Sequence, residues 1–239
     1  MSDSNILIFD TPHSVAAAFA DKLQKWTIRD QPFHLALSGG STPKILFQYL
    51  ASLPADFLPW ERIHLWWGDE RSVAPDHAES NYGMTKTFLL DHIAIPEENI
   101  HRVKGEISPE KAATEYIEEI KAYIPEKDGW PVFDLIMLGM GDDGHTASIF
   151  PHEIYLLRSP SICAVATHPD SGQKRVTLTG KVINASARVA FLVTGKSKAE
   201  KVSEIMRKMP QSHIYPAAYI QPVAGKLYWF LDNAAHGIA

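Results

Sequence analysis

Short apolar runs alternate with helical patterns along this chain, and this alternation restricts the fold more than any other feature. Strand-like runs cover Asn5–Phe9, Phe33–Leu37, Ile63–Trp67, Leu135–Leu138, Ile162–Ala166, Arg188–Val193 and Lys226–Phe230. Helical patterns place Val15, Ala18, Phe19 and Leu23 on one face, begin again near Pro43, and cover Asn81–Leu90, Glu110–Tyr123 and Lys198–Met209. The alternation predicts an α/β, Rossmann-like fold with a mainly parallel central sheet and helices on both faces.

The length of 239 residues fits one domain, 1–239, with a small subregion around residues 152–190. A net charge of −5 argues against general nucleic-acid binding, which needs a basic surface. No apolar stretch reaches the ~20 residues of a membrane span, and the start MSDSNILIFD does not resemble a signal peptide. We expect a soluble cytoplasmic protein without membrane association. Cys163 is the single cysteine, which excludes an intramolecular disulfide and predicts a buried, inert thiol.

Four polar clusters directly follow predicted strands. They are Ser38–Thr42, Gly68–Arg71, Gly139–His145 and Thr194–Lys198. In open α/β sheets, ligands bind beyond the carboxyl ends of parallel strands. The four clusters are therefore expected to meet along one edge of the sheet and to form the ligand site.

The segment SGGSTPK predicts an anion site at a strand-to-helix turn. Gly39 and Gly40 let backbone N–H groups approach a phosphate, and a helix N-terminus favours negative charge. Thr42 is a suitable N-cap before Pro43, and Lys44 adds a positive charge. The alternative is an ordinary strand-to-helix turn.

Arg71 lies in the segment WWGDERSV, where it either binds phosphate or carboxylate or forms an ion pair within its own cluster. Two further segments resemble nucleotide motifs. GMGDDGH fits G-x-G-x-x-G, but Asp142 and Asp143 would repel a pyrophosphate, and no acidic residue follows at the ribose position. AFLVTGKS fits a relaxed phosphate-loop pattern. Its middle residues, however, are expected to form a buried strand, whereas a phosphate loop needs a flexible glycine-rich turn there. Neither segment predicts a nucleotide cofactor.

His145 is the strongest catalytic candidate, because it follows two aspartates and three glycines at a turn expected to face the ligand. Asp143 can hold one ring nitrogen and leave the other free to take a proton. A serine-nucleophile elbow, a metalloprotease motif and a zinc-type Cys/His cluster are all lacking. The residues favour general-base chemistry by histidine on a phosphorylated small molecule, with no metal and no cofactor.

The combined motifs resemble the glucosamine-6-phosphate isomerase/6-phosphogluconolactonase superfamily. The segments that carry the resemblance are LALSGGSTP, WWGDERSV with Asn81-Tyr82, LIMLGMGDDGHTASIFP, RVTLT at 175–179, LVTGKSKA and the tail YPAAYI…LYWFLDNAA. Deaminases of the superfamily resemble G-H-I-A-F-N-E-P after the histidine, with an active-site glutamate. This chain has Thr146 to Pro151 there and no such glutamate, which favours the lactonase branch. Ile149 stands where leucine is common, and PDSGQK at 169–174 is less proline-rich than the usual loop.

The resemblance implies hydrolysis of 6-phospho-D-glucono-1,5-lactone in the pentose phosphate pathway. It implies His145 as general base with Asp143 orienting it. The residues expected to bind the sugar phosphate are Gly39, Gly40, Ser41, Thr42, Lys44, Arg71, Asn81, Arg175 and Lys198. The expected partner is this small-molecule lactone, and the sequence leaves a weak homo-oligomer open. A sugar-phosphate isomerase or deaminase and a non-catalytic sugar-phosphate sensor are the alternatives.

Overall fold

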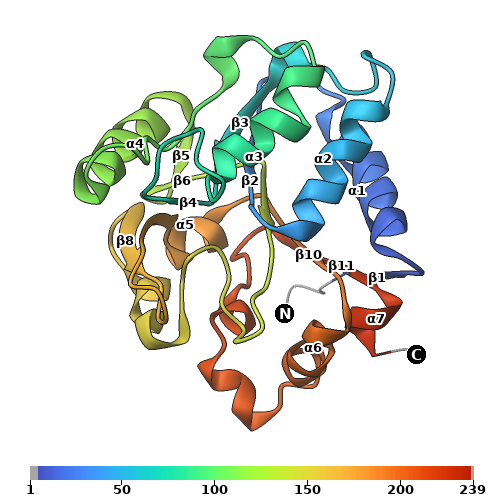
Figure 1. Cartoon of the computed structure of the whole chain (residues 1–239), viewed down its shortest axis with the longest axis vertical. Coiled ribbons are helices and arrows are strands. Elements are labelled where there is room, and N and C mark those ends of the chain that lie inside the picture. Colours follow the sequence, from blue (N-terminus) through green and yellow to red (C-terminus); the bar gives the residue numbers. More distant parts are fainter. Residues whose placement is uncertain (1–4, 238–239) are drawn as a thin grey trace.

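The computed structural model describes residues 5–237, which form a six-stranded central sheet (Figure 1). In spatial order its strands are β1 (Asn5–Phe9), β11 (Lys226–Asp232), β10 (Arg188–Val193), β7 (Leu135–Leu138), β2 (Phe33–Leu37) and β3 (Ile63–Trp67). Every neighbouring pair is parallel. The prediction of a mainly parallel sheet is confirmed.

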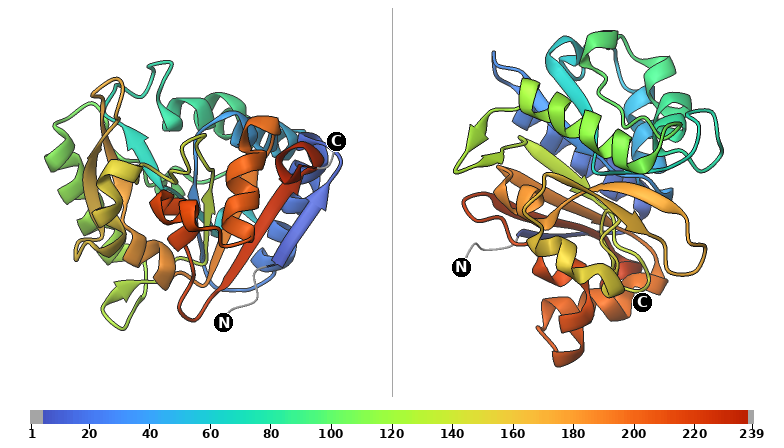
Figure 2. Two further views of the ribbon diagram at one scale, coloured as in Figure 1. Left: turned by 90° about the horizontal axis from the view of Figure 1, so that it is seen from below. Right: turned by 90° about the vertical axis from the view of Figure 1, so that its left-hand side faces the viewer.

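Helices cover both faces of this sheet (Figure 2). They are α1 (Pro12–Thr27), α2 (Ser41–Ser52), α3 (Asn81–Phe88), α4 (Pro109–Tyr123), α5 (Gly180–Ala185), α6 (Ala199–Met206) and α7 (Asn233–His236). Successive strand residues point to opposite faces, so Leu135 and Met137 join the core beneath α1 and α2. Ile136 and Leu138 join the core beneath α4 and α5. The central strands are apolar at every position because both of their faces are buried.

A second sheet of three antiparallel strands lies beside the first. Its order is β4 (Asp69–Arg71), β9 (Lys174–Leu178) and β8 (Cys163–Thr167). The strand predicted over 162–166 is therefore β8 and lies outside the parallel sheet. The connection to β9 is only six residues, which suits an antiparallel hairpin and is too short for a parallel crossover. This sheet carries Arg71 and Arg175 on neighbouring strands.

The remaining elements are short. A two-stranded hairpin joins β5 (Glu126–Lys127) to β6 (Trp130–Pro131), and 3₁₀ helices cover Trp60–Arg62, Leu90–His92, Glu97–Asn99, Pro151–Arg158, Lys196–Lys198, Pro210–Ile214 and Pro216–Tyr219. The helix predicted to reach Met209 ends at Met206, because Lys208 adopts a left-handed φ of 52°.

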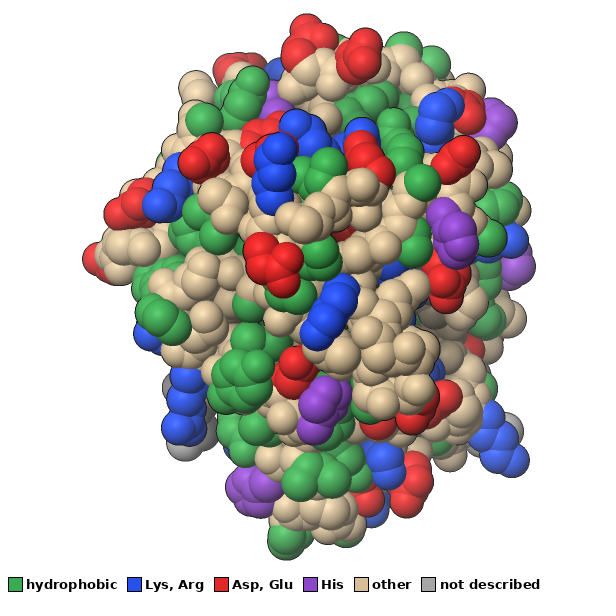
Figure 3. All heavy atoms as spheres, turned by 60° about the vertical axis from the view of Figure 1, so that its left-hand side comes forward, with side chains coloured by type: hydrophobic (Ala, Val, Ile, Leu, Met, Phe, Trp, Pro, Cys, Tyr) green, Lys and Arg blue, Asp and Glu red, His purple; other side chains and the backbone are tan. Residues whose placement is uncertain are grey.

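Three expectations from composition concern the surface and the core. None of the helices within residues 5–237 combines the length and apolar character required to cross a bilayer. Lys and Arg side chains are interspersed with Asp and Glu on the face drawn in Figure 3, and no single basic surface forms there. Cys163 is 3% exposed, and burial raises the pKa of its thiol well above the ordinary value.

Candidate active site

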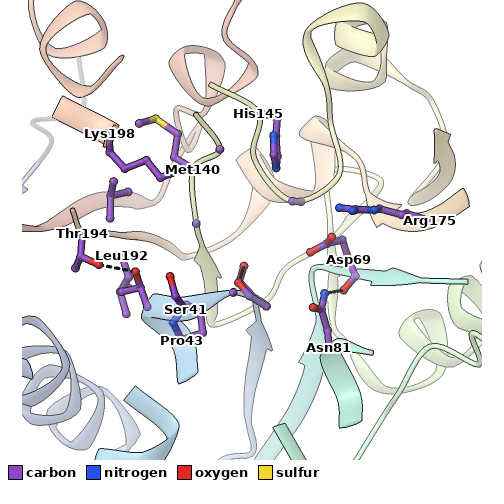
Figure 4. A pocket seen from close by; sticks show the side chains of 18 of the residues that line it. Ser41, Pro43, Asp69, Asn81, Met140, His145, Arg175, Leu192, Thr194 and Lys198 are labelled. Atoms are coloured by element: carbon purple, nitrogen blue, oxygen red, sulfur yellow. Dashed lines mark hydrogen bonds between the residues drawn. The ribbon is translucent and has the colours of Figure 1, made fainter. Parts of the chain in front are cut away.

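A cavity of about 210 Å³ opens at the carboxyl ends of β2, β3, β7 and β10. Members of all four predicted polar clusters line it, as expected for parallel strands. Figure 4 shows Lys198, Met140 and Thr194 on one side of the cavity and Asp69, Asn81 and Arg175 on the other, with His145 above. Residues separated by more than 150 positions in the sequence are thus brought to one site.

The turn after β7 holds Asp143 and His145 as a bonded pair. Asp143 Oδ1 lies 2.6 Å from His145 Nδ1 and also accepts the His145 backbone N–H at 3.0 Å. Burial alone would raise the pKa of Asp143, but the hydrogen bonds and charge of His145 outweigh it and lower the pKa to about 2. Asp143 is therefore a carboxylate at neutral pH. Nε2 is the ring nitrogen of His145 without a hydrogen-bond partner among residues 5–237.

Gly141 makes room for this pair. A Cβ at Gly141 would lie 2.2 Å from His145 Nδ1 and 2.6 Å from Asp143 Oδ1. The same residue donates its N–H to the carbonyl of His145 at 2.9 Å, which closes the turn. The second glycine of GMGDDGH thus makes room for the Asp143–His145 pair.

The turn after β2 leads into α2 and differs from the predicted capping. The helix begins at Ser41 with Gly40 as N-cap, at a φ of 109°, and no side chain caps it. The prediction of Thr42 as N-cap is wrong, because its hydroxyl instead lies 2.7 Å from Thr194 Oγ1 across the cavity. The first amides of α2 therefore have no partner within the helix and lie at the cavity wall.

Asn81 and Glu70 fix the wall opposite Lys198. Asn81 is the first residue of α3, and its Nδ2 donates to the carbonyl of Asp69 at 2.9 Å. Its side chain lies directly against Gly39, where a Cβ would come within 1.8 Å of Oδ1. Glu70 is buried and accepts the backbone N–H groups of Arg71, Asn81 and Tyr82 at 2.7–2.8 Å. Burial raises the pKa of Glu70 despite these bonds.

Three cationic side chains face the cavity. Arg71 and Arg175 form no ion pair with a carboxylate of the described residues, although Arg71 donates to the backbone carbonyl of Glu79. Burial first, and then the like charge of Arg71, lowers the pKa of Arg175. Lys198 Nζ pairs with Asp142 Oδ1 at 2.6 Å. Two guanidinium groups that form no ion pair within residues 5–237 are an anion-binding arrangement, although Asp69 also lines the cavity.

The cavity brings together most residues predicted from the sequence. Those lining it are Gly39, Gly40, Ser41, Thr42, Arg71, Asn81, His145, Arg175 and Lys198. Asp143 lies behind His145. Lys44 lies outside this cavity, since its Nζ sits 4.4 Å over the ring of Phe88 on α3. Its position in the first turn of α2 rotates it away from the exposed amides.

Several lining residues were not among the predicted site residues, and Asp69, Thr194 and Ala147 are the ones with distinctive geometry. Asp69 is 5% exposed, and its Oδ2 accepts a hydrogen bond from Ser148 Oγ at 2.6 Å. Thr194 holds Thr42, and Ala147 adopts an unusual left-handed φ of 48° two residues after His145. Asp69 and Thr194 belong to two of the polar clusters that follow predicted strands. Their position directly after a strand could therefore have identified them as cavity residues. Nothing in the sequence signals the conformation of Ala147.

The side chains that line the cavity indicate the chemistry it can support. No group of three or more His, Cys, Asp or Glu side chains among residues 5–237 is arranged to hold a metal ion. The cavity instead offers an imidazole backed by a carboxylate, two unpaired guanidinium groups and the N-terminus of a helix. This set suits proton transfer on a small anionic molecule.

Comparison with known proteins identifies the family. The family model described as "Glucosamine-6-phosphate isomerases/6-phosphogluconolactonase" matches residues 10–229. The 6-phosphogluconolactonase of Haemophilus influenzae is 44% identical over 232 residues, covering 97% of this chain and 98% of the relative. The crystal structure of devB protein superposes with a TM-score of 0.94 at 45% identity, over 99% of this chain and 100% of the other. The 6-phosphogluconolactonase of Trypanosoma cruzi has a TM-score of 0.88 at 30% identity, over 99% and 97%. The chain therefore belongs to the glucosamine-6-phosphate isomerase/6-phosphogluconolactonase family.

Proposed function

We propose that this chain is a 6-phosphogluconolactonase, which hydrolyses 6-phospho-D-glucono-1,5-lactone to 6-phosphogluconate in the pentose phosphate pathway. The name of the family model covers two activities, so a lactonase has to be distinguished from an isomerase or deaminase. The lactonase is supported by relatives of that name that match nearly the whole chain. It is also supported by the segment Thr146 to Pro151, which lacks the glutamate that the deaminase branch places after its histidine.

The single observation that carries the proposal is the Asp143–His145 pair beside unpaired cations. Asp143 holds Nδ1 of the imidazole, so the neutral ring presents Nε2 to the cavity as a base. Arg71 and Arg175 lie in the same cavity and supply charge for a phosphate ester. A phosphorylated sugar lactone needs a base at its carbonyl group and cationic groups at its phosphate. These two sites must lie no further apart than the two ends of one sugar.

Hydrolysis begins when His145 Nε2 removes a proton from a water molecule. The water oxygen bonds to the lactone carbonyl carbon, and the carbonyl oxygen takes the electron pair as an oxyanion. Asp143 stabilises the imidazolium that forms, because its carboxylate stays ionised. General-base catalysis contributes about 10²–10⁴-fold, so positioning of the lactone supplies much of the remaining rate.

The intermediate then collapses with cleavage of the bond between the carbonyl carbon and the ring oxygen. The imidazolium of His145 delivers its proton to that ring oxygen, which becomes a hydroxyl of 6-phosphogluconate. The histidine returns to its neutral form, and the balance is one water molecule added across one ester bond. No metal and no cofactor enters this sequence of steps.

The phosphate provides the anchor that positions the carbonyl. We assign it to the amides of Gly39 to Thr42 at the start of α2, with Arg71, Arg175 and Lys198 around it. Asn81 borders the same cavity and completes the sugar site. Lys44 has no part in this assignment, because its Nζ lies over Phe88.

The decisive experiment compares two substrates. Freshly prepared 6-phosphogluconolactone and glucosamine 6-phosphate are each supplied to the purified protein, and spontaneous lactone hydrolysis is subtracted. We expect turnover of the lactone only, measured as 6-phosphogluconate formed. Ammonia release from glucosamine 6-phosphate would assign the deaminase instead. Tight binding of 6-phosphogluconate without turnover of either compound would assign a sensor.

A further inference from the structure

The residue between the catalytic acid and base is held by the segment that follows β10. Gly144 separates Asp143 from His145 and has a φ of 80°, and a Cβ there would lie 2.6 Å from both Cβ and Cγ of Tyr215. The Tyr215 side chain therefore packs directly on the backbone of Gly144. Two residues later, the N–H of Ala217 donates to the carbonyl of Gly144 at 3.1 Å. Gly144 is thus held both by packing and by a hydrogen bond.

Tyr215 is in turn fixed by α6. Its side chain is 4% exposed, and its hydroxyl donates to Glu204 Oε2 at 2.6 Å. Lys201 Nζ lies 5.1 Å over the Tyr215 ring and 3.7 Å from Glu204 Oε2. Burial, followed by the bond to Glu204, raises the pKa of Tyr215, so the phenol remains a hydrogen-bond donor at neutral pH.

The same segment reaches the catalytic turn at a second point. α6 begins immediately after Lys198, whose Nζ lies 2.6 Å from Asp142 Oδ1. Asp142 and Gly144 flank Asp143, so the residues on both sides of the acid are tied to the region 198–217. A displacement of this region would move the turn that sets the Asp143–His145 distance.

We propose that Tyr215 is a positioning residue for the Asp143–His145 pair and acts through Gly144. The inference rests on the proposed function only in naming the reaction that reports it. A shift of about 1 Å in a reacting group is enough to cost up to 10²-fold in rate. Tyr215 borders Gly144 and does not line the substrate cavity, so its effect falls on the base and leaves phosphate binding unchanged.

The test compares Tyr215→Leu with Tyr215→Phe. Tyr215→Leu removes the ring from Gly144, and we expect kcat for the lactone to fall at least tenfold with KM within about twofold of wild type. Tyr215→Phe keeps the ring and loses only the hydrogen bond to Glu204. Its kcat should therefore lie within about threefold of the wild-type value. Tyr219→Leu is the matched control, because Tyr219 is 38% exposed and its hydroxyl bonds only the carbonyl of His213.

A second readout does not depend on turnover. The ¹⁵N spectrum of the His145 ring, assigned with His145→Gln, reports which nitrogen carries the proton. We expect the Nδ1–H form in wild type and Tyr215→Phe, and a mixture with the Nε2–H form in Tyr215→Leu. An unchanged His145 spectrum in folded Tyr215→Leu would overturn the inference, as would wild-type kcat. Failure of wild type to hydrolyse the lactone would overturn the proposed function alone, since the spectrum still decides the role of Tyr215.

Discussion

Arg71 and Arg175 are register partners across the antiparallel strands β4 and β9, so two guanidinium groups stand side by side at the wall of the cavity. Burial and mutual repulsion make this pairing unfavourable in the absence of an anion, as the lowered pKa of Arg175 indicates. The backbone of Arg71 is nevertheless fixed, because buried Glu70 accepts its N–H at 2.7 Å. The unfavourable charge pair becomes favourable when a phosphate dianion lies between them.

Replacing either arginine should therefore weaken substrate binding more than chemistry. We expect Arg71→Ala and Arg175→Ala each to raise KM for the lactone about 10–100-fold, equivalent to about 1.4–2.7 kcal/mol, with smaller changes in kcat. Steady-state kinetics at constant ionic strength measure both values. Arg207→Ala, on the exposed end of α6, is the control and should leave KM unchanged. A fall in kcat with unchanged KM would place the arginines at the reacting carbonyl instead.

The Asp143–His145 pair should behave as one catalytic unit. His145→Ala removes the base, and we expect loss of the catalysed rate while the cooperative unfolding transition is retained. Asp143→Asn cannot stabilise the imidazolium and should lower kcat about 10²–10⁴-fold. The double variant should be no slower than His145→Ala, because residues that act together are not additive. Near-normal kcat in the His145 variant would contradict the mechanism.

Gly141 offers a test of geometry without any change of charge. In Gly141→Ala the new methyl group would overlap His145 Nδ1 and Asp143 Oδ1, so the two side chains must separate. We expect kcat to fall at least 100-fold while the protein remains folded by circular dichroism. The matched control is Gly129→Ala in the β5–β6 hairpin, where a Cβ meets nothing within 4 Å. That control should keep full activity even if its positive φ of 81° lowers stability.

Acid stability should depend on His34, at the end of β2 remote from the catalytic turn. Burial, and then the neighbouring His64, lowers the pKa of His34 to about 4, with His101 and Arg29 acting in the same direction and Asp134 opposing them. The unfolded chain binds this proton near pH 6.5, so the stabilisation is complete above that pH and is lost as the pH falls toward 4.

The expected loss from this one group is about 2 kcal/mol between pH 7 and pH 5. His34→Gln keeps an acceptor for Trp66 Nε1, which bonds His34 Nδ1 at 3.2 Å, and removes the titrating group. Urea unfolding at the two pH values should show a smaller pH dependence in His34→Gln than in wild type. An equal dependence in both proteins would assign the acid sensitivity to other groups.

The sequence predicted the strands of the main sheet well because their apolar runs are buried on both faces. The predicted bounds match those of β1, β2, β3, β7 and β10. Members of the four polar clusters line one cavity at the carboxyl ends of the parallel strands, as expected. The strand predicted over 162–166 lies within one residue of β8, but the sequence did not predict β4 as a strand, because three-residue strands carry almost no periodic signal. The packing of Tyr215 on Gly144 could not be predicted from the sequence. It depends on the path of a run of 3₁₀ turns, and tertiary contacts determine that path. The place of Lys44 over Phe88, outside the residues that line this cavity, likewise depends on the rotation of α2, which the sequence did not give.

The pairing of β1 with β11 has a consequence for synthesis of the protein. β1 has its only ladder within the described residues with Lys226–Asp232, which is the last strand to be translated. At translation rates of about 5–20 residues per second, β11 is synthesised tens of seconds after β1 and α1. The apolar surfaces of β1 and α1 therefore lack their native partner strand for that time. During that time Leu7, Phe9 and Phe19 lack the aromatic ring of Phe230 that Phe9 and Phe19 contact in the native core. The core around β1 and α1 is therefore completed only after nearly the whole chain has been synthesised.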